Sequence, residues 1–384
     1  MGKGILLVTE LFPPAVGGSA TLLASVYGRI TRMPVTVLSG TQGSSRGDLG
    51  FQVQHVEMDG SRRGVRSAAE LRQHLGIARQ IRSRGLGSNV VHAARPLPEG
   101  LAALAAASMW PRGPQYVCWA HGEELTAALT SREHGWLAKR VCRGAAAVIA
   151  SSENAGRIVR GLGVPAPRVH VIYPGVDSEQ FRPDIDGSHL RQRLAPNANF
   201  ILLSVGRLQR RKGHDLTIEA VAMLAAELPG LHYVIAGSGL ERERLEALSA
   251  ARGIVDRVHF TGDFPTAELP ALYAACDLFV LPTRQDEQDI EGFGIVFLEA
   301  AAAGKAAVGG NNGGVPEAVA AGQTGSLVDG HDAAELARTI RMYVEAPDLL
   351  SRMGEAGRRR VIQSFTWERA ASLVTELHTV VATA

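Results

Sequence analysis

The feature that most constrains the fold is a regular alternation of short apolar runs, rich in Val and Ile, with longer helical patterns. In the first half of the chain the expected strands occupy residues 5–8, 35–38, 53–56, 89–92, 116–119, 147–150 and 169–172. This alternation is typical of a parallel sheet covered by helices, because parallel strands are buried on both faces and joined through helical crossovers. The sequence therefore predicts a doubly wound α/β domain.

A second alternation follows a break in the first. Residues 173–177 and 181–183, which are rich in Pro and Gly, interrupt the rhythm and are expected to form a linker. Strands then resume at residues 200–205, 232–236, 258–261, 278–281, 306–309 and 326–328, and residues 365–381 indicate an amphipathic helix. A chain of 384 residues is long enough for two domains that each bury a core. We therefore expect two Rossmann-like domains, with ligands at the carboxyl ends of the strands in a cleft between them.

The composition excludes several classes of protein. Forty Lys and Arg residues against 38 Asp and Glu give a formal net charge of +2, which argues against a nucleic-acid-binding protein. The three cysteines, Cys118, Cys142 and Cys276, have no metal-ligand spacing, so we expect buried thiols in a reducing cytoplasm. No apolar run is long enough to span a membrane, and the start of the chain resembles a first strand rather than a signal peptide. The expectation is a cytoplasmic protein, either soluble or peripheral to a membrane.

The stretch Glu291-Gly292-Phe293-Gly294-Ile295-Val296-Phe297-Leu298-Glu299 joins two carboxylates through a small loop and an apolar helical run. If a helix begins at Ile295, its first N–H groups and its positive dipole end favour a phosphate. Carboxylates eight residues apart on a helix lie about 12 Å apart along its axis, too far to share one proton or metal. They would instead bracket an elongated ligand. The alternative is a helix start with two solvated glutamates.

A strand, a glycine turn and a cationic cluster occur together in Gly206-Arg207-Leu208-Gln209-Arg210-Arg211-Lys212-Gly213. Arg207 and Lys212 are expected to direct a planar guanidinium and a point charge at one diphosphate. We expect Arg210 and Arg211, which lie between them, to form a solvated face of the loop. The alternative for Arg207 and Lys212 is a surface charge cluster.

Five motifs, taken in their order along the chain, resemble those of the retaining glycosyltransferases of family 4, which have the two-domain GT-B fold. They are Gly17-Gly18, His121-Gly122, Gly206-Arg207 with Lys212-Gly213, residues 291–299, and Gly313-Gly314-Val315-Pro316-Glu317. The resemblance extends over nearly the whole chain, and the polar loop 284–290 is most similar to the phosphatidylinositol mannosyltransferase subgroup. The sequence departs from the family pattern at Pro174, where asparagine is common in the family. Proline at this position should stiffen the linker between the two expected domains.

The resemblance also implies that the two domains bind different substrates. Residues 1–175 would bind the acceptor, residues 176–365 the nucleotide sugar, and residues 366–384 would form a helix that crosses back to the first domain. Arg207 and Lys212 would stabilise the negative charge that grows on the departing diphosphate. Glu291 would accept hydrogen bonds from hydroxyls of the transferred sugar, and Glu299 from the ribose. His121 would hold a sugar hydroxyl, although a lone histidine at a strand end is usually structural.

Further donor-binding residues are implied by the same resemblance. They are Gly17, Gly18, Gly262, Asp263, Phe264, Gly292, Phe293, Gly294, Ile295 and Val296. Glycines let the backbone approach a ligand closely, and the N–H groups after Phe293 would face the diphosphate. For the two glycines of the first domain, and for residues 262–264, the alternative is an ordinary turn between a strand and a helix.

Two acidic groups are candidate metal sites. Asp184-Ile185-Asp186 has the D-x-D pattern of metal-dependent transferases but lies in the linker, and Asp286, Glu287 and Asp289 precede Glu291. We expect solvated loops in both places. Because Arg207 and Lys212 supply positive charge, neither a metal nor any other cofactor is expected.

Segment 61–85 is strongly basic in a chain of otherwise balanced charge. Its arginines are Arg62, Arg63, Arg66, Arg72, Arg79, Arg82 and Arg84. A basic helix can dock on anionic lipid at the inner face of the cell membrane. The alternative is a solvated helix without a lipid partner.

Together these features predict a retaining α-glycosyltransferase that moves a hexose from a nucleotide diphosphate sugar to a hydroxyl of a glycan or lipid. GDP-mannose is the first expectation for the donor, followed by UDP-sugars. The alternatives are a nucleotide-sugar epimerase or phosphorolytic enzyme of the same fold, and a sugar-nucleotide-binding protein without catalysis. A dehydrogenase is disfavoured because no G-x-G-x-x-G follows the first strand.

Overall fold

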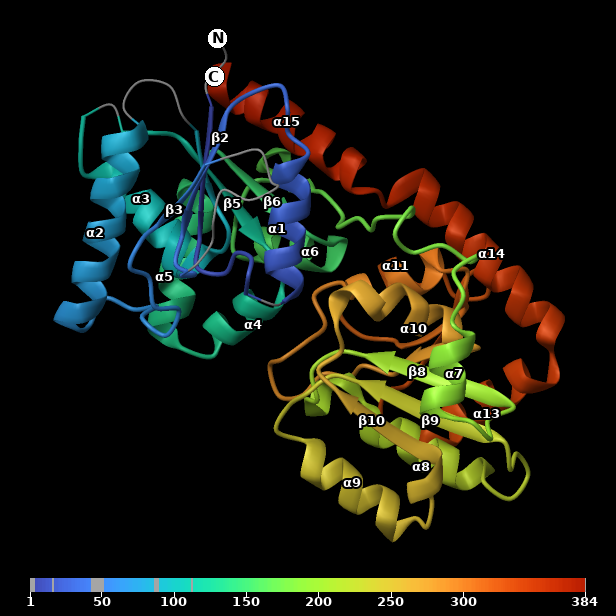
Figure 1. Ribbon diagram of the computed structural model, residues 1–384. Coiled ribbons are helices and arrows are strands. Elements are labelled where there is room, and N and C mark those ends of the chain that lie inside the picture. Colours follow the sequence, from blue (N-terminus) through green and yellow to red (C-terminus); the bar gives the residue numbers. More distant parts are fainter. Residues whose placement is uncertain (1–3, 16, 43–51, 86–89, 112, 384) are drawn as a thin grey trace. The chain divides into compact units, whose positions relative to one another are not determined.

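The computed structural model describes residues 4–15, 17–42, 52–85, 90–111 and 113–383. The chain divides into two compact units, and Figure 1 colours the ribbon by residue number. The first unit contains Met1–Pro174 together with Trp367–Ala384, and the second contains Gly175–Thr366. The second unit is therefore inserted, in sequence, between two parts of the first.

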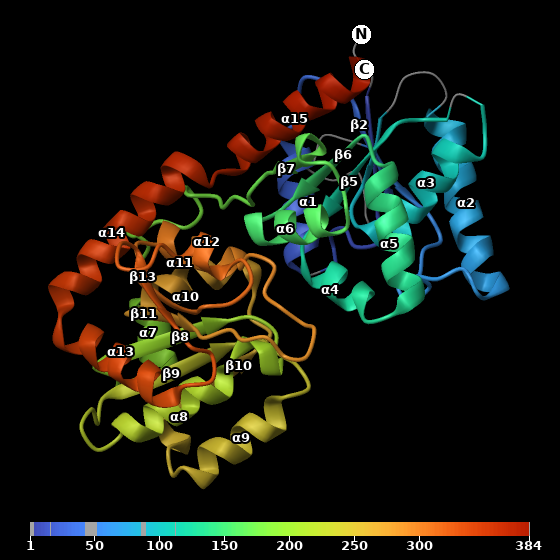
Figure 2. The ribbon, with the colours of Figure 1, turned by 180° about the vertical axis from the view of Figure 1, so that it is seen from behind.

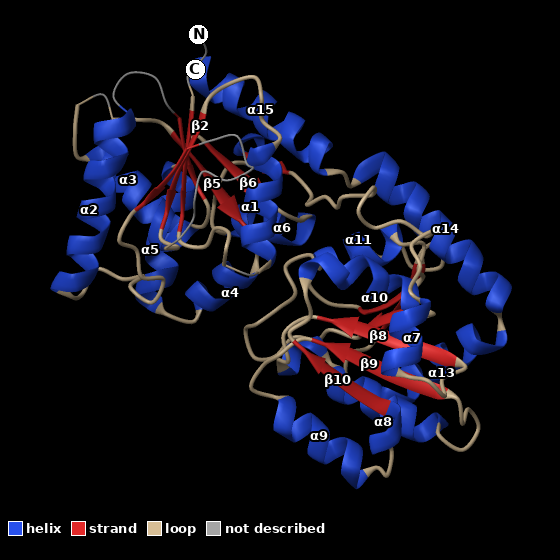
Figure 3. Ribbon diagram, in the orientation of Figure 1, coloured by secondary structure: helices blue, strands red, loops and turns tan. Residues whose placement is uncertain are grey.

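Among the described residues of the first unit, seven parallel strands form one sheet in the order β3-β2-β1-β4-β5-β6-β7, drawn in red in Figure 3. Their bounds are β1 (Ile5–Thr9), β2 (Val35–Ser39), β3 (Gln52–His55), β4 (Val90–Ala93), β5 (Tyr116–Ala120), β6 (Ala147–Ala150) and β7 (Val169–Val171). Every strand expected in this half is present. Asn89, assigned to the fourth expected strand, lies outside the described residues.

Helices cover both faces of this sheet. They are α1 (Gly18–Gly28), α2 (Ala68–Gly85), α3 (Leu101–Ser108), α4 (Glu123–Leu129), α5 (Arg132–Gly144), α6 (Glu153–Gly161) and α15 (Trp367–Thr383). Side chains of α2, α3, α5 and α6 share one buried apolar cluster with the strands. Helices α1 and α15 contact each other, and α15 also contacts β4, on the other side of the sheet (Figures 1 and 2).

A chain of buried polar side chains ties α15 to the first unit. The Trp119 indole N–H donates to the Tyr27 hydroxyl at 2.9 Å, and that hydroxyl lies 2.7 Å from Nδ1 of His92. The other ring nitrogen of His92 lies 3.1 Å from Nδ1 of His378, on α15. The Tyr27 oxygen that accepts from Trp119 still has its own hydrogen to donate, and Nδ1 of a neutral His92 ring can accept it. Burial, together with His378, holds the pKa of His92 well below its usual value.

The second unit repeats the same topology. Its described strands form a parallel six-stranded sheet in the order β10-β9-β8-β11-β12-β13. Their bounds are β8 (Phe200–Val205), β9 (Leu231–Ala236), β10 (Val258–Gly262), β11 (Leu278–Leu281), β12 (Ala307–Gly310) and β13 (Gly325–Val328). In each sheet the strand order reverses once, between β1 and β4 and between β8 and β11. Doubly wound sheets bind ligands beyond the carboxyl ends of the strands at such a reversal.

The helices of the second unit again lie on two faces. They are α7 (Ser188–Leu194), α8 (His214–Leu224), α9 (Arg242–Ala251), α10 (Leu269–Ala275), α11 (Ile295–Ala302), α12 (Val315–Ala318), α13 (Ala333–Glu345) and α14 (Pro347–Ser364). Helices α8, α9 and α13 share one buried cluster with the strands, whereas α11 contacts α10, α12 and α14. The apolar helix expected from Ile295 onward is present as α11.

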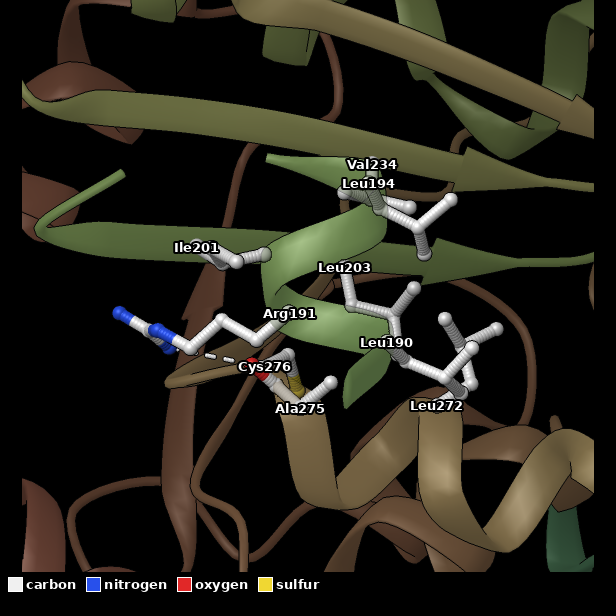
Figure 4. Close-up of a pocket in the computed structure, with 9 residues that line it drawn as sticks. All are labelled: Leu190, Arg191, Leu194, Ile201, Leu203, Val234, Leu272, Ala275 and Cys276. Atoms are coloured by element: carbon white, nitrogen blue, oxygen red, sulfur yellow. Dashed lines mark hydrogen bonds between the residues drawn. The ribbon is translucent and has the colours of Figure 1, made fainter. Parts of the chain in front are cut away.

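A small apolar cavity lies between α7, α10 and the sheet of the second unit (Figure 4). Its volume is about 10 Å³, room for one water molecule at most. Most of its lining is aliphatic, and Arg191 turns its charged end away to donate to the carbonyl of Ala275 at 3.0 Å. The cavity is a packing gap, and none of the candidate site residues lines it.

Candidate functional site

The candidate residues of the second unit gather at the carboxyl ends of its strands. Arg207 follows β8, and Glu291 lies in the connection after β11, so these two residues flank the point where the strand order reverses. Gly262 ends β10, and Gly313 follows β12. Since the carboxyl ends of parallel strands lie along one edge, the four positions share one rim of this sheet.

A tight turn brings the cationic cluster onto this rim. Arg210–Lys212 form a 3-10 turn that ends at Gly213, in a left-handed conformation with φ 72°. A Cβ at Gly213 would lie 2.1 Å from the carbonyl oxygen of Pro282, just after β11. Only glycine fits there. This close approach of the backbone places Arg211 and Lys212 near the connection after β11, which contains Glu291.

Glu291 is held by two cations at once. Its Oε2 accepts from Lys212 Nζ at 2.5 Å and from Arg211 Nη1 at 2.6 Å, and Arg211 Nε lies 3.0 Å from an oxygen of Asp289. Arg211, Lys212 and Glu291 are only 3, 8 and 8 % exposed. The expectation that Arg211 is solvated was therefore wrong. Arg211 is buried because it forms ion pairs with Asp289 and Glu291. The Arg210 side chain, in contrast, is 62 % exposed, as expected.

Opposing effects set the pKa of Glu291. Burial raises it, but Lys212 and Arg211 outweigh burial and lower the pKa to about 2. The carboxylate is therefore ionised at neutral pH. Within the described part of the chain, its Oε1 has no hydrogen-bond donor, so one oxygen remains able to accept from a ligand hydroxyl.

Arg207 differs from Lys212 in its surroundings. Its side chain is exposed, and its guanidinium makes no ion pair or hydrogen bond with any described residue. The Lys212 ammonium lies about 4.0 Å from the position of a Cβ on neighbouring Gly206. One cation of the expected pair is thus fixed by Glu291, while the other is available to a ligand.

The start of α11 adds backbone donors to the same rim. Gly294, in a left-handed conformation with φ 87°, precedes the helix and supplies no side-chain cap. The N–H groups of Ile295 and Val296 make no hydrogen bond with any residue that the structure describes. Unpaired N–H groups and the helix dipole favour an anion at this position.

Glu299, one turn further along α11, has a different environment. The Tyr273 hydroxyl donates to its Oε2 at 2.7 Å. Burial raises the pKa of Glu299, and the hydrogen bond from Tyr273 lowers it, so the net shift is upward. Its second oxygen, Oε1, makes no hydrogen bond within the described ranges.

The two pairs of motif glycines have different surroundings. A Cβ at Gly17 or Gly18 would meet nothing within 4 Å, so the space above these glycines is open. A Cβ at Gly313 would lie 2.1 Å from the carbonyl oxygen of Glu291, and Gly314 donates its N–H to that oxygen at 2.9 Å. The first pair therefore leaves room for a ligand, whereas the second pair allows the backbone to pack beneath the catalytic candidate Glu291.

His121 lies at the carboxyl end of β5 in the first unit. Its ring stacks on Trp119 with centroids 5.9 Å apart, and its backbone N–H donates to Glu124 at 2.7 Å. Nε2 lies 3.1 Å from the carbonyl oxygen of Ala94, which can only accept, so Nε2 carries the hydrogen. In the neutral ring, Nδ1 is left as an acceptor.

A cluster of charged residues at the carboxyl ends of the strands of the first unit was not expected from the sequence. Arg95, after β4, pairs with Glu10, after β1, and with Glu99 at 3.1 Å. Glu99 is fully buried and also accepts from the backbone N–H of Glu10 at 2.9 Å. Its Oε2 is buried and has no partner among the described residues. These three residues flank the reversal of the first sheet as Arg207 and Glu291 flank that of the second.

Three other acidic candidates form ion pairs or hydrogen bonds within their own unit. Asp184 pairs with Arg182 at 3.4 Å, Asp186 accepts from the N–H of Ser188 at 2.8 Å, and Asp263 accepts from the Ser238 hydroxyl at 2.5 Å. In the described ranges, no group of three or more His, Cys, Asp or Glu side chains is arranged to hold a metal ion. Of the helices in the same ranges, none combines the length and apolar character that crossing a membrane requires.

Both halves of the chain match known protein families. The model described as Glycosyltransferase Family 4 matches residues 16–180, and the model described as Glycosyl transferases group 1 matches residues 188–360. The chain is 31 % identical over 385 residues to the GDP-mannose-dependent alpha-(1-6)-phosphatidylinositol monomannoside mannosyltransferase of Mycobacterium tuberculosis, covering 96 % of each protein. It is 36 % identical to the D-inositol 3-phosphate glycosyltransferase of Streptomyces scabiei, covering 62 % of this chain and 55 % of that protein.

Solved structures share the fold at lower sequence identity. Anabaena HepE in complex with UDP has a TM-score of 0.82 and 22 % identity, covering 97 % of this chain and 99 % of that chain. Sucrose-phosphate synthase from Thermosynechococcus elongatus also has a TM-score of 0.82 and 22 % identity, with full coverage of both chains. At this identity the likeness concerns the fold alone.

Proposed function

The chain belongs to glycosyltransferase family 4 and has the GT-B fold, and from this premise we propose that it moves a hexose, with retention of the α configuration, from a nucleotide diphosphate sugar to a hydroxyl of a glycan or lipid. That it is a glycosyltransferase follows from the family. The observation that best supports this specific reaction is the Glu291 carboxylate, which Lys212 and Arg211 fix on the same rim that carries the exposed Arg207.

We assign the diphosphate to the rim of the second domain. The groups that can bind it are the exposed guanidinium of Arg207, the ammonium of Lys212 and the N–H groups of Ile295 and Val296 at the start of α11. Negative charge grows on the diphosphate as its bond to the sugar breaks. Groups already directed at that charge lower the barrier, since they need not reorganise during the reaction.

The proposed chemistry is a front-face substitution. The bond between the anomeric carbon and the diphosphate oxygen breaks, a bond to the acceptor oxygen forms on the same face, and the departing phosphate oxygen takes the acceptor proton. The products are the glycoside and the nucleoside diphosphate, so no side chain has to act as nucleophile. Glu291 holds a hydroxyl of the sugar through Oε1, and His121 offers Nδ1 to a hydroxyl. Glu299 binds the ribose. We propose no metal or cofactor for this reaction.

For the donor we propose GDP-mannose, with a UDP-sugar as the next candidate. The mycobacterial relative is named as GDP-mannose-dependent, whereas the Anabaena structures hold UDP and UDP-glucose. For the acceptor, the names of both relatives include inositol, so an inositol-containing lipid or sugar phosphate is the first acceptor to test.

The test begins with thermal shifts against GDP, UDP and ADP, because a ligand that binds only the folded state raises the apparent stability. The preferred nucleotide then identifies the sugar donors to incubate with and without acceptor. Transfer that needs both partners and keeps the α linkage supports the proposal. Conversion of the donor alone would indicate an epimerase, and binding without any turnover would indicate a protein without catalysis.

Segment 61–85 supports a further proposal, contact with anionic lipid at the inner face of the cell membrane. Arg72 and Arg79 are exposed on α2, which also carries Leu71, 45 % exposed. Other cations of the segment are engaged within the domain, since Arg66 pairs with Glu133 and Arg82 lies over Trp110. Each exposed cation near an anionic surface contributes about 1 kcal/mol.

Liposome flotation tests this contact. We expect more protein to float with vesicles that contain acidic lipid than with neutral vesicles, and we expect the Arg72→Glu/Arg79→Glu variant to lose the difference. Arg338→Glu/Arg359→Glu, at two exposed positions of the second domain, makes the same change of charge and is the matched control. Equal recovery with both kinds of vesicle would exclude the membrane contact.

A further inference from the structure

We propose that Tyr273 is the positioning residue that makes Glu299 selective for ribose hydroxyls, so that the enzyme distinguishes a ribonucleotide donor from its deoxy analogues through a buried hydrogen bond. This inference rests on the proposed function, because the ribose is assigned to Glu299. Tyr273 lies on α10, 26 positions before Glu299, and no sequence motif singled it out.

The ring of Tyr273 is fixed from several sides. It packs edge-on against Phe181 with centroids 5.6 Å apart and lies against Phe279 at 5.7 Å. Tyr273 is fully buried. Its hydroxyl reaches Glu299 Oε2 at 2.7 Å, with a longer contact of 3.4 Å to the carbonyl of Val296. The ring therefore holds the hydroxyl in place, and the hydroxyl holds one oxygen of the carboxylate.

The two oxygens of Glu299 consequently have different roles. Oε2 is bound to Tyr273, while Oε1 makes no hydrogen bond with any described residue. A glutamate side chain in solution has many rotamers, and one that is fixed beforehand loses less entropy on binding. The hydrogen bond also favours the ionised carboxylate against the effect of burial. A carboxyl group that is oriented in advance offers its remaining oxygen, Oε1, as an acceptor to a hydroxyl of a ribose.

The same geometry predicts which ligands bind less well when the Tyr273 hydroxyl is removed. Tyr273→Phe keeps the ring and its aromatic contacts but removes the donor to Glu299. The carboxylate then gains freedom and binds ribose hydroxyls less well. The diphosphate and base contacts do not pass through Glu299, so an analogue without ribose hydroxyls should bind the variant as it binds the wild type.

The experiment compares GDP with 2′,3′-dideoxy-GDP, and UDP with 2′,3′-dideoxy-UDP, by calorimetry on the full chain. We expect the wild type to prefer the ribonucleotide by about tenfold, the effect of about one hydrogen bond. In Tyr273→Phe we expect most of this preference to disappear through weaker binding of the ribonucleotide, with unchanged binding of the dideoxy form. Tyr343→Phe is the matched control, because its buried hydroxyl bonds to Ser326 at 2.8 Å in the same domain.

Glu299→Ala separates this inference from the function on which it rests. If both Glu299→Ala and Tyr273→Phe lose the preference, the inference is supported. If only Glu299→Ala loses it, the ribose assignment stands and the role of Tyr273 is overturned. If Tyr273→Phe weakens both nucleotides equally, its role is general packing and the inference fails. If neither variant changes the preference, or neither diphosphate binds, the ribose assignment and the inference fail together.

Discussion

The two domains repeat one topology but have opposite electrostatic character where the strand order reverses. In the second domain, Arg211 and Lys212 pair with two carboxylates, Glu291 and Asp289, and the exposed Arg207 adds a third cation, which leaves an excess of positive charge. In the first domain one cation, Arg95, is shared by Glu10 and Glu99, which leaves an excess of negative charge. The same fold therefore provides one rim suited to an anionic diphosphate and one suited to hydroxyls.

The largest expected effect tests the cationic rim of the second domain. We expect Arg207→Ala and Lys212→Ala each to lower turnover by about tenfold or more, and the double variant by about a hundredfold or more, because each removes charge that stabilises the leaving group. Steady-state kinetics with the identified donor measures the effect. Arg210→Ala is the control, since Arg210 is exposed and lies 3.5 Å from Glu241 in a surface pair that contributes little. Full activity in the double variant would contradict the assignment of the diphosphate to this rim.

A second prediction compares the two buried glutamates by their contribution to stability. Glu291→Gln leaves two buried cations without their shared carboxylate, so we expect it to destabilise the second domain by about 3–5 kcal/mol. Glu99→Gln leaves Arg95 paired with Glu10, and we expect a smaller loss of about 1–3 kcal/mol in the first domain. Hydrogen exchange in the strands of each sheet measures the two effects in the intact chain. A larger loss from Glu99→Gln would reverse the comparison.

The depressed pKa of Glu291 predicts a dependence of stability on pH. Its folded value of about 2 lies below the ordinary 4.5, so its contribution is present above about pH 4.5 and is lost as the pH falls toward 2. The difference corresponds to about 3 kcal/mol. We expect the stability of the second domain to fall less steeply over this interval in Glu291→Gln than in the wild type. Identical slopes in acid unfolding curves would show that Glu291 does not carry this effect.

The smallest expected effect is that of removing divalent metal. If cations of the protein balance the leaving-group charge, EDTA should leave turnover unchanged, and added Mg²⁺ should not raise it. The assay compares initial rates before and after dialysis against EDTA. A loss of activity that Mg²⁺ restores would show that Arg207 and Lys212 do not neutralise the diphosphate alone.

Much of the fold could be predicted from the sequence because its signals are local. Buried parallel strands such as β8 are continuous apolar runs, and their repetition after the linker indicates a second domain. The position of the candidate residues at strand ends could be predicted for the same reason. Arg207 and Glu291 each follow a recognisable strand, and a glycine-containing loop leads into α11.

The contacts between these residues could not be predicted, because they join distant parts of the chain. Arg211 and Glu291 are 80 positions apart, and no local pattern distinguishes Arg211 from the exposed Arg210 beside it. Arg95 and Glu10 are 85 positions apart. Tyr273 appears in the sequence as one more apolar residue of a short helix. In each case the missing information is how elements far apart in the sequence pack against each other, which depends on the whole domain.

Helix α15 has a consequence for the order in which the protein is made. Residues 175–366 are complete before residues 367–383 emerge from the ribosome, so the second unit has all its described strands while the first still lacks the helix that carries His378. The unit that begins the chain is therefore the later of the two to finish. A nascent chain halted near residue 366 would lack the helix that covers part of α1 and β4, so this surface is the last of the first unit to be covered.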